Sequence, residues 1–254
     1  RDSVASRGLG DVYKRQLYSG DGSTQAITGV GFQPDAVWLK KRSGSADHTL
    51  YDAVRGTTKV IYPNDAGQEG TVSGVTAFGS DGFTVGSASN GNQSGQTFVS
   101  WNWKAGTTSG ITGSPSITPS SYSFNQTSGF SIIAYTGNGT AGATIPHGLG
   151  VAPSCVIIKA TGAANSWLVG FTAIGWTKAL NLNSTTAANT ASTYWNDTAP
   201  SSTLVSLGTH DRGNDSGVTY VAYCFADIQG FSKAGIWKGN GAANFNNRQV
   251  GPYI

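Results

Sequence analysis

The 254-residue sequence has no methionine, two cysteines and a single glutamate, Glu69, and charged residues make up only 11% of it. Strong helix formers are therefore scarce, which argues against a mostly helical protein and against a coiled coil. The low content of Lys and Arg disfavours a nucleic-acid-binding protein. No apolar run approaches the roughly 20 residues of a membrane-spanning helix, so we expect no membrane span.

Glycine and aromatic residues are abundant instead. The chain has 36 Gly, 7 Trp, 10 Tyr and 10 Phe, and its hydrophobic share of 38% is enough to build a core. Short segments rich in β-branched and aromatic residues alternate with Gly, Asn, Asp and Ser, which is typical of an all-β protein. We predict about eight strands per structural unit, arranged as a two-sheet sandwich of jelly-roll or concanavalin A-like type.

The first sixteen residues stand apart from the rest. Residues 6–16 resemble the in-frame translation of a transposase-type sequencing adapter, and residues 1–5 fit its outer end plus a barcode. We therefore predict that residues 1–16 are not native and exclude them from the fold prediction; a genuine N-terminal arm is the alternative. Without them the formal charge falls from +3 to +1, with 12 basic and 11 acidic residues, so it no longer indicates an anionic partner.

An internal repeat organises the remaining chain. The motif at Tyr18–Gly22 recurs at Tyr135–Gly139 and again at Trp237–Gly241. Residues 31–40 align with residues 150–159 at an offset of 119 residues, and further along the offset becomes 122, which corresponds to one loop insertion. The repeat predicts the following division: 17–108, first module; 109–127, a Gly/Ser/Thr/Pro-rich linker; 128–232, second module; 233–254, the truncated start of a third module.

Three strand features follow from the pattern. Ala36–Lys40 and Cys155–Lys159 are apolar on both faces up to the lysine, so we predict central strands whose lysine ends emerge into water. In Thr97–Trp103, the residues Val99, Trp101 and Trp103 share one face, which we predict to be the buried one. Asp81-Gly82 predicts a hairpin.

Residues capable of chemistry are few. A glycosidase needs two carboxyl groups flanking one bond. Asp47 and Asp52 could supply one such pair in the first module, but the second module has no equivalent. We therefore predict that the chain is not an enzyme. No glycine-rich turn resembles a phosphate-binding loop, and we predict no cofactor.

The histidines and cysteines give no metal-binding pattern. His48, His147 and His210 lie at no ligand spacing from one another or from a cysteine, so we predict polar loop residues and no metal. Cys155 and Cys224 both belong to the second module. Two small buried thiols are our first interpretation, and a disulfide is the alternative.

The most polar cluster spans residues 47–56 of the first module. It could form a sugar-binding edge, in which Tyr51 stacks on the sugar and Asp47, His48, Asp52 and Arg55 hydrogen-bond its hydroxyls. The alternative is a strand entering a tight turn, with Asp52 and Arg55 forming an ion pair at the surface.

Several segments of the sequence resemble a known family. The stretches Gly-Phe-Gln-Pro-Asp-Ala-Val-Trp-Leu-Lys-Lys-Arg at 31–42, Leu-Tyr-Asp-Ala-Val-Arg-Gly at 50–56, Asn-Gly-Asn-Gln-Ser-Gly at 90–95 and Thr-Tyr-Val-Ala-Tyr-Cys-Phe-Ala at 219–226 are similar to a repeated domain of uncharacterised function. That domain is common in large structural and tail-fibre proteins of marine tailed phages. The resemblance covers both modules and the start of the third, and it implies no catalytic motif.

The leading hypothesis is accordingly a non-enzymatic virion module, part of a tail fibre or another phage structural protein, that contributes to host attachment. The resemblance implies assembly in the host cytoplasm, a final place in the virion, and sister subunits, other virion proteins and a host-surface glycan as partners. The second hypothesis is a lectin-like glycan-binding domain. The third is a fragment of a polysaccharide depolymerase.

Overall fold

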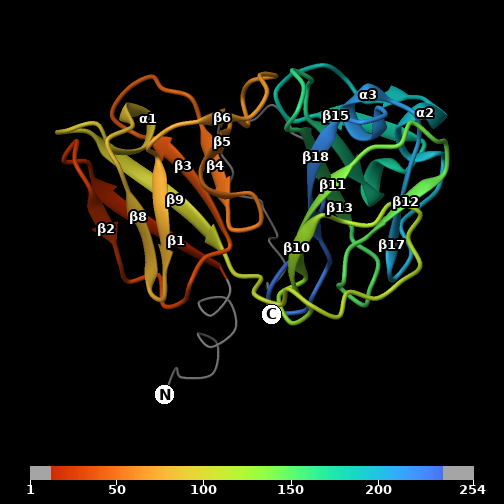
Figure 1. Ribbon diagram of the computed structural model, residues 1–254, viewed down its shortest axis with the longest axis horizontal. Helices are drawn as coiled ribbons and strands as arrows, with labels where there is room; N and C mark the ends of the chain where they lie inside the picture. Colours follow the sequence, from red (N-terminus) through yellow and green to blue (C-terminus); the bar gives the residue numbers. More distant parts are fainter. Residues whose placement is uncertain (1–12, 237–254) are drawn as a thin grey trace, which may run out of the picture.

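The computed structural model describes residues 13–236, and this part of the chain is built mainly of antiparallel β-sheets (Figure 1). The predicted all-β class is confirmed. Each half of the described chain contributes one large and one small sheet. The few helices are single turns, as expected for a sequence poor in helix formers.

The N-terminal half forms a six-stranded sheet in the order β1-β9-β3-β4-β5-β6 and a three-stranded sheet in the order β2-β8-β7. Between them lies a core of aliphatic and aromatic side chains that includes Val37, Val60 and Phe83. The elements are β1 (Tyr13–Ser19), β2 (Gln25–Ile27), β3 (Ala36–Lys41), β4 (Thr49–Asp52), β5 (Gly56–Ile61), β6 (Gly70–Thr71), β7 (Val75–Gly79), β8 (Gly82–Val85), α1 (Ser89–Asn92) and β9 (Thr97–Trp103).

The C-terminal half forms a seven-stranded sheet in the order β10-β11-β18-β13-β14-β15-β16 and a two-stranded sheet of β12 and β17. Its core is the largest cluster of the described chain and includes Ile145, Trp195 and Leu207. The elements are β10 (Ser121–Asn125), β11 (Phe130–Thr136), β12 (Ala143–Pro146), β13 (Cys155–Ala160), β14 (Leu168–Phe171), the 3₁₀ turn η2 (Thr172–Ile174), β15 (Lys178–Asn181), β16 (Asn189–Thr190), α2 (Ser192–Trp195), β17 (Leu204–Leu207), α3 (Asp211–Asn214) and β18 (Thr219–Phe225).

The two large sheets have the same internal order of strands. The series β1, β9, β3, β4, β5, β6 corresponds to the series β11, β18, β13, β14, β15, β16, and the residue offsets between the two are those of the sequence repeat. Strand β10 is an addition at the edge of the second sheet, next to β11. The same succession of strands therefore leads to the same sheet in both halves.

The large sheets face each other in the middle of the molecule, and the small sheets lie toward the outside (Figure 1). One apolar cluster joins the facing sheets; its buried members are Ala36, Leu50, Ile61, Ala105, Phe130, Ile132, Trp167, Val221 and Tyr223. Along β3, Ala36 and Trp38 point to this joint, whereas Val37 and Leu39 point into the core of their own half. The strands predicted as apolar on both faces are thus central strands covered on both sides, as predicted, although Lys159 of β13 does not emerge into water.

The prediction for Thr97–Trp103 was right for one of its three residues: Val99 is buried, but Trp101 and Trp103 lie on the less buried face. Phe98, Ser100 and Asn102 of β9 are fully buried inside the N-terminal half, whereas Trp101 and Trp103 are half-buried on the side of the joint. The Asn102 amide nitrogen donates to the Lys14 carbonyl at 2.8 Å and to the Ser100 hydroxyl at 3.0 Å, whereas its Oδ1 has no partner among the described residues. The predicted alternation of side chains along this strand was correct, but the polarity of the side chains did not show which face is the more buried one.

The predicted boundaries differ from the structure at two places. Residues 121–125 of the predicted linker form β10, because Phe124 is buried and the strand pairs with β11. Residues 13–16 of the segment excluded as adapter-derived lie in β1, which pairs with β9 along its whole length. The adapter origin of residues 1–16 stays a prediction. Residues 1–12 and the third copy of the repeat motif at Trp237–Gly241 lie outside the described residues.

The repeated Tyr-x-Gly motif has a structural explanation. A Cβ atom on Gly20 would lie 2.5 Å from the Gln93 carbonyl oxygen, and one on Gly137 would lie 2.4 Å from the Asp215 carbonyl oxygen. Both glycines therefore permit the same close approach of two backbone segments. The tyrosines before them also act alike: the hydroxyl of Tyr135, for example, donates to the Gly213 carbonyl at 2.7 Å.

The hairpin predicted at Asp81-Gly82 is confirmed. Strands β7 and β8 are antiparallel neighbours that meet at this turn. The Asp81 carboxylate accepts hydrogen bonds from the backbone N–H groups of Gly29, at 3.0 Å, and Gly31, at 2.7 Å. These bonds hold the pKa of Asp81 below its usual value and fasten the turn to the loop after β2.

Candidate functional site

The polar cluster at residues 47–56 is divided between a groove and a buried joint. Asp47 is exposed and His48 is half-exposed, whereas Tyr51 and Asp52 are fully buried and the Arg55 side chain is 5% exposed. The structure therefore does not bring all five predicted sugar-binding residues to one surface.

Tyr51 cannot stack on a sugar in this arrangement. Its ring packs inside the N-terminal half, and its hydroxyl lies so close to Gly74 that a Cβ atom there would overlap it. Burial raises the pKa of the Tyr51 hydroxyl above its ordinary value. The alternation of β4 sends Leu50 and Asp52 to the joint and Tyr51 to the core, so one pleat separates residues that the sequence places side by side.

Asp52 and Arg55 form the predicted ion pair, but it is buried and not at the surface. The Arg55 Nε atom donates to Asp52 Oδ2 at 2.6 Å, and the Arg55 backbone N–H donates to Asp52 Oδ1 at 2.8 Å. The guanidinium also donates to the backbone carbonyls of Leu50 and Lys59, both at 3.2 Å. Burial disfavours the charge of Arg55, but the neighbouring Asp52 carboxylate more than offsets this and raises the pKa of Arg55.

Two further residues complete this network, and the sequence did not single out either for it. The Tyr223 hydroxyl, from β18 of the other half, donates to Asp52 Oδ2 at 2.6 Å. Glu69 Oε2 accepts from Arg55 at 2.9 Å. Glu69 was visible as the sole glutamate of the chain, whereas nothing in the pattern of Tyr223 indicated that it crosses to the other half.

A second polar contact crosses the joint at Asp35. This carboxylate accepts from the Ser123 hydroxyl of β10 at 3.0 Å and from the Ala105 backbone N–H at 2.8 Å. Burial raises the pKa of Asp35, and these hydrogen bonds partly offset the effect. The contact ties the start of β3 to the strand that opens the C-terminal half.

A third contact uses Lys159, whose side chain was expected to emerge into water at the end of β13. Lys159 is fully buried, because the loop after β5 of the other half covers it. Its ammonium group donates to the carbonyls of Ala66, Ala160 and Asn165 at 2.8 to 3.1 Å. Burial lowers the pKa of Lys159 to about 8, against a partial opposing effect of Asp65. Lys40, at the equivalent position of the first half, is only half-buried.

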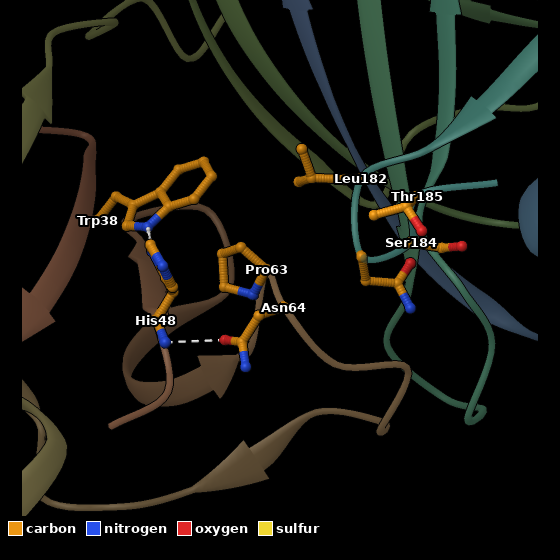
Figure 2. Close-up of a pocket in the computed structure, with 8 residues that line it drawn as sticks. Trp38, His48, Pro63, Asn64, Leu182, Ser184 and Thr185 are labelled. Atoms are coloured by element: carbon orange, nitrogen blue, oxygen red, sulfur yellow. Dashed lines mark hydrogen bonds between the residues drawn. The ribbon is translucent and has the colours of Figure 1, made fainter. Parts of the chain in front are cut away.

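Beside these contacts, a groove of about 590 Å³ opens between the two halves (Figure 2). Trp38, His48, Pro63 and Asn64 line one side, and Leu182, Asn183, Ser184 and Thr185 line the other. The lining thus combines apolar rings with hydroxyl and amide groups. Of the five residues predicted to bind sugar, His48 is the one that lines it.

Hydrogen bonds fix the walls of this groove. The Trp38 indole Nε1 donates to His48 Nδ1 at 2.9 Å, so the proton of a neutral His48 is on Nε2. The His48 backbone N–H donates to Asn64 Oδ1 at 2.8 Å, and Asn64 Nδ2 donates to Asp47 Oδ1 at 2.8 Å. Burial and the charge of Lys40 lower the pKa of His48, which favours the neutral ring.

Comparison with known proteins gives one family. A domain of unknown function, DUF7483, matches residues 9–250. The chain belongs to the DUF7483 family. The region matched to DUF7483 contains both halves, the joint and the groove. No curated protein and no solved structure matches the sequence.

The other histidines of this DUF7483 chain have structural surroundings. His147 lies in the loop after β12, as predicted, but it is fully buried there; its Nδ1 accepts from the Leu149 N–H at 3.3 Å, and burial lowers its pKa to about 4. His210 caps α3, where its Nδ1 accepts from the Arg212 N–H at 3.3 Å, and its ring stacks on Tyr194.

The cysteines are both free thiols, as the first interpretation had it, but only Cys224 is fully buried and Cys155 is half-buried. Cys224 points into the core of its half, whereas Cys155 lies opposite Phe225 and shares the other face of the sheet. Burial raises the pKa of each thiol to about 12, so both are protonated at neutral pH.

Residues 13–236 lack two features that would point to a metal site or a membrane span. They contain no cluster of three or more His, Cys, Asp or Glu side chains placed to hold a metal ion. None of their helices combines the length and apolarity needed to cross a membrane.

Proposed function

We propose that this chain is a non-enzymatic structural unit of a tailed-phage virion, of the tail-fibre type, in which two copies of one β-sandwich module are locked into a single rigid body. The family resemblance of the sequence motifs supports the virion setting. The observation that carries the structural role is the buried Tyr223–Asp52–Arg55 network, because it commits the most polar cluster of the sequence to holding the two halves together.

The interpretation as two copies of one module is supported by local contacts as well as by strand order. The His48 N–H donates to Asn64 Oδ1, and 119 residues further along the Trp167 N–H donates to Asn183 Oδ1. An asparagine thus fixes the start of β4 in the N-terminal half and of its counterpart β14 in the C-terminal half. Repeated residues of this kind are explained by folding, which leaves few for a shared ligand site.

The joint between the modules has the character of a protein interior. Its apolar side chains form one buried cluster, and its charged groups are paired or hydrogen-bonded, as buried charges must be. A single hydrophobic contact between domains permits relative motion, whereas several directional bonds across one interface favour a fixed geometry. Fixed geometry is what a load-transmitting element of a fibre requires.

The depolymerase alternative finds little support in this geometry. Asp47 is exposed and bonded to Asn64, whereas Asp52 has no exposed surface and already accepts three hydrogen bonds. A carboxylate in that position cannot reach a glycosidic bond or hold a nucleophilic water molecule.

The virion role can be tested on the natural gene product. Negative-stain electron microscopy of the complete natural chain should show elongated or oligomeric particles, and the neighbouring genes should encode other tail proteins. Compact monomeric globules, or neighbours unrelated to virion assembly, would overturn the virion role. Small-angle X-ray scattering of the present chain tests the rigid pair separately: one compact particle is expected, and a distribution of separated lobes would contradict it.

A further inference from the structure

The groove has a closed counterpart on the other side of the joint. Trp167 occupies the position equivalent to His48, and its indole is fully buried. The Trp167 Nε1 atom donates to the backbone carbonyls of Tyr62, at 2.9 Å, and Asp65, at 3.1 Å. In the groove, His48 faces Leu182–Thr185, which is the segment equivalent to Pro63–Ala66. In both places the residue before the fourth strand of one repeat copy faces the loop segment of the other copy. On one side the Trp167 indole closes the contact, and on the other side the groove stays open.

The closed side also carries hydrogen bonds that the open side lacks among the described residues. Lys159 reaches across the joint to the Ala66 carbonyl, and the Glu69 backbone N–H donates to the Thr161 carbonyl at 3.1 Å. Lys40, the equivalent of Lys159, donates instead to its own neighbour, the Lys41 carbonyl, at 3.0 Å. The open groove is therefore a property of the N-terminal half's own residues and not a general gap between the sheets.

The Trp38 ring is held in place before any ligand arrives. Its N–H is bonded to His48, and both His48 and Trp101 stand at right angles to it, with ring centroids 5.8 and 6.4 Å away. The equivalent residue on the closed side is Ile157, which offers no flat surface. An immobilised aromatic ring at the wall of a groove loses little entropy when a ligand packs on it.

The chemistry of the lining selects a class of ligand. All eight lining side chains are uncharged when His48 is neutral, so the groove offers no counter-charge for a phosphate, a carboxylate or a cation. It offers the rings of Trp38 and Pro63 and the side chain of Leu182 beside the amides of Asn64 and Asn183 and two hydroxyls. His48 Nε2 is a donor with no partner among residues 13–236. A ring with apolar C–H faces and a rim of hydroxyl groups matches this combination.

We propose that the groove binds one neutral pyranose unit of a glycan, with a C–H face of the sugar against Trp38 and its hydroxyls toward His48, Asn64 and Asn183. This site differs from the sugar-binding edge predicted from the sequence, because it shares only His48 with it. The proposal goes beyond the structural role but rests on the fixed joint, because the walls of the groove come from both halves.

The test closes the groove in the way that the protein closes its counterpart. His48→Trp places an indole at the position equivalent to Trp167. Thr185→Trp fills the groove from the opposite wall, at a residue that is exposed and so contributes little to folding. Val151→Trp is the matched control, because Val151 is 44% exposed and does not line the groove. Each protein is applied to an array of neutral, N-acetylated, sialylated and sulfated glycans, and hits are measured by titration calorimetry.

Wild type and Val151→Trp should bind the same neutral glycans, and both groove variants should bind them at least about tenfold more weakly, as expected when a central contact is blocked. Binding that survives both groove variants would overturn the site. Binding confined to sialylated or sulfated glycans would overturn the ligand class, and no binding by the wild type would overturn the proposal as a whole. None of these results bears on particle shape or rigidity, so failure here is distinguishable from failure of the structural role.

Discussion

Removing the positive charge from the joint is the sharpest test of the structural argument. In Arg55→Met the side chain keeps an unbranched apolar stem but loses the guanidinium, so it no longer pairs with Asp52, whose side chain has no exposed surface. The carboxylate would retain only the Arg55 backbone N–H and the Tyr223 hydroxyl as donors. Loss of one partner of a buried ion pair destabilises a protein by about 3 to 5 kcal/mol, because the remaining charge is left uncompensated.

The assay is urea denaturation at pH 7, followed by tryptophan fluorescence and circular dichroism. Lys59→Met is the matched control: Lys59 pairs with Glu69 at 3.6 Å, but its side chain is 43% exposed, so we expect a loss below about 1 kcal/mol. A variant that combines Asp52→Leu, Arg55→Met and Tyr223→Phe removes the two fully buried charges of this site and leaves Glu69, whose side chain is 19% exposed and still pairs with Lys59. It should be more stable than Arg55→Met alone, because an apolar replacement of a whole buried pair is often nearly neutral.

Two outcomes would refute this reasoning. If Arg55→Met lost no more stability than Lys59→Met, burial would not make the Asp52–Arg55 pair special. If the triple variant were less stable than Arg55→Met, the penalty would come from lost packing and not from an unpaired charge. In either case the network could not be the element that locks the two halves.

Two further predictions concern single residues. His147 is buried with a pKa of about 4 against an ordinary value of 6.5, so the unfolded chain binds the extra proton first and stability should fall by roughly 3 kcal/mol as pH drops from about 7 to 4. His147→Gln should flatten that part of a pH series of urea midpoints, and an unchanged slope would show that other groups cause it. Gly137→Ala should destabilise the fold by about 1 to 3 kcal/mol, because its Cβ atom would lie 2.4 Å from the Asp215 carbonyl oxygen. Gly235→Ala, where a Cβ atom meets nothing within 4 Å, is its control, and equal urea midpoints for the two variants would contradict the argument.

The sequence was a good guide to features that depend on local spacing. The scarcity of helix formers and the alternation of short apolar segments predicted an all-β chain, and the turn chemistry of Asp81-Gly82 predicted the hairpin between β7 and β8. These features follow from preferences of residues for their immediate neighbours. The repeat offset predicted two series of strands, and the two large sheets have the same strand order.

Which face of a strand is covered could not be read in this way. Ser100 and Asn102 look like surface residues, yet both are buried, because a second sheet covers one face of β9 and the other half of the chain covers the opposite face. For the same reason Asp52 and Arg55 resemble a surface pair in the sequence. The period of two shows which residues share a face of a strand, but only the packing of the neighbouring sheets decides which face is buried.

The candidate site depended most on tertiary structure. His48 was predicted as a ligand residue, but the opposite wall of the groove, Leu182–Thr185, lies more than 130 residues further along the chain. Tyr223 joined the network of Asp52 for the same reason, across more than 170 residues of chain. The sequence by itself determined the all-β class, because strand and turn preferences are local. Only the tertiary structure decided that two sheets would face each other, which buries one polar cluster and leaves one groove open.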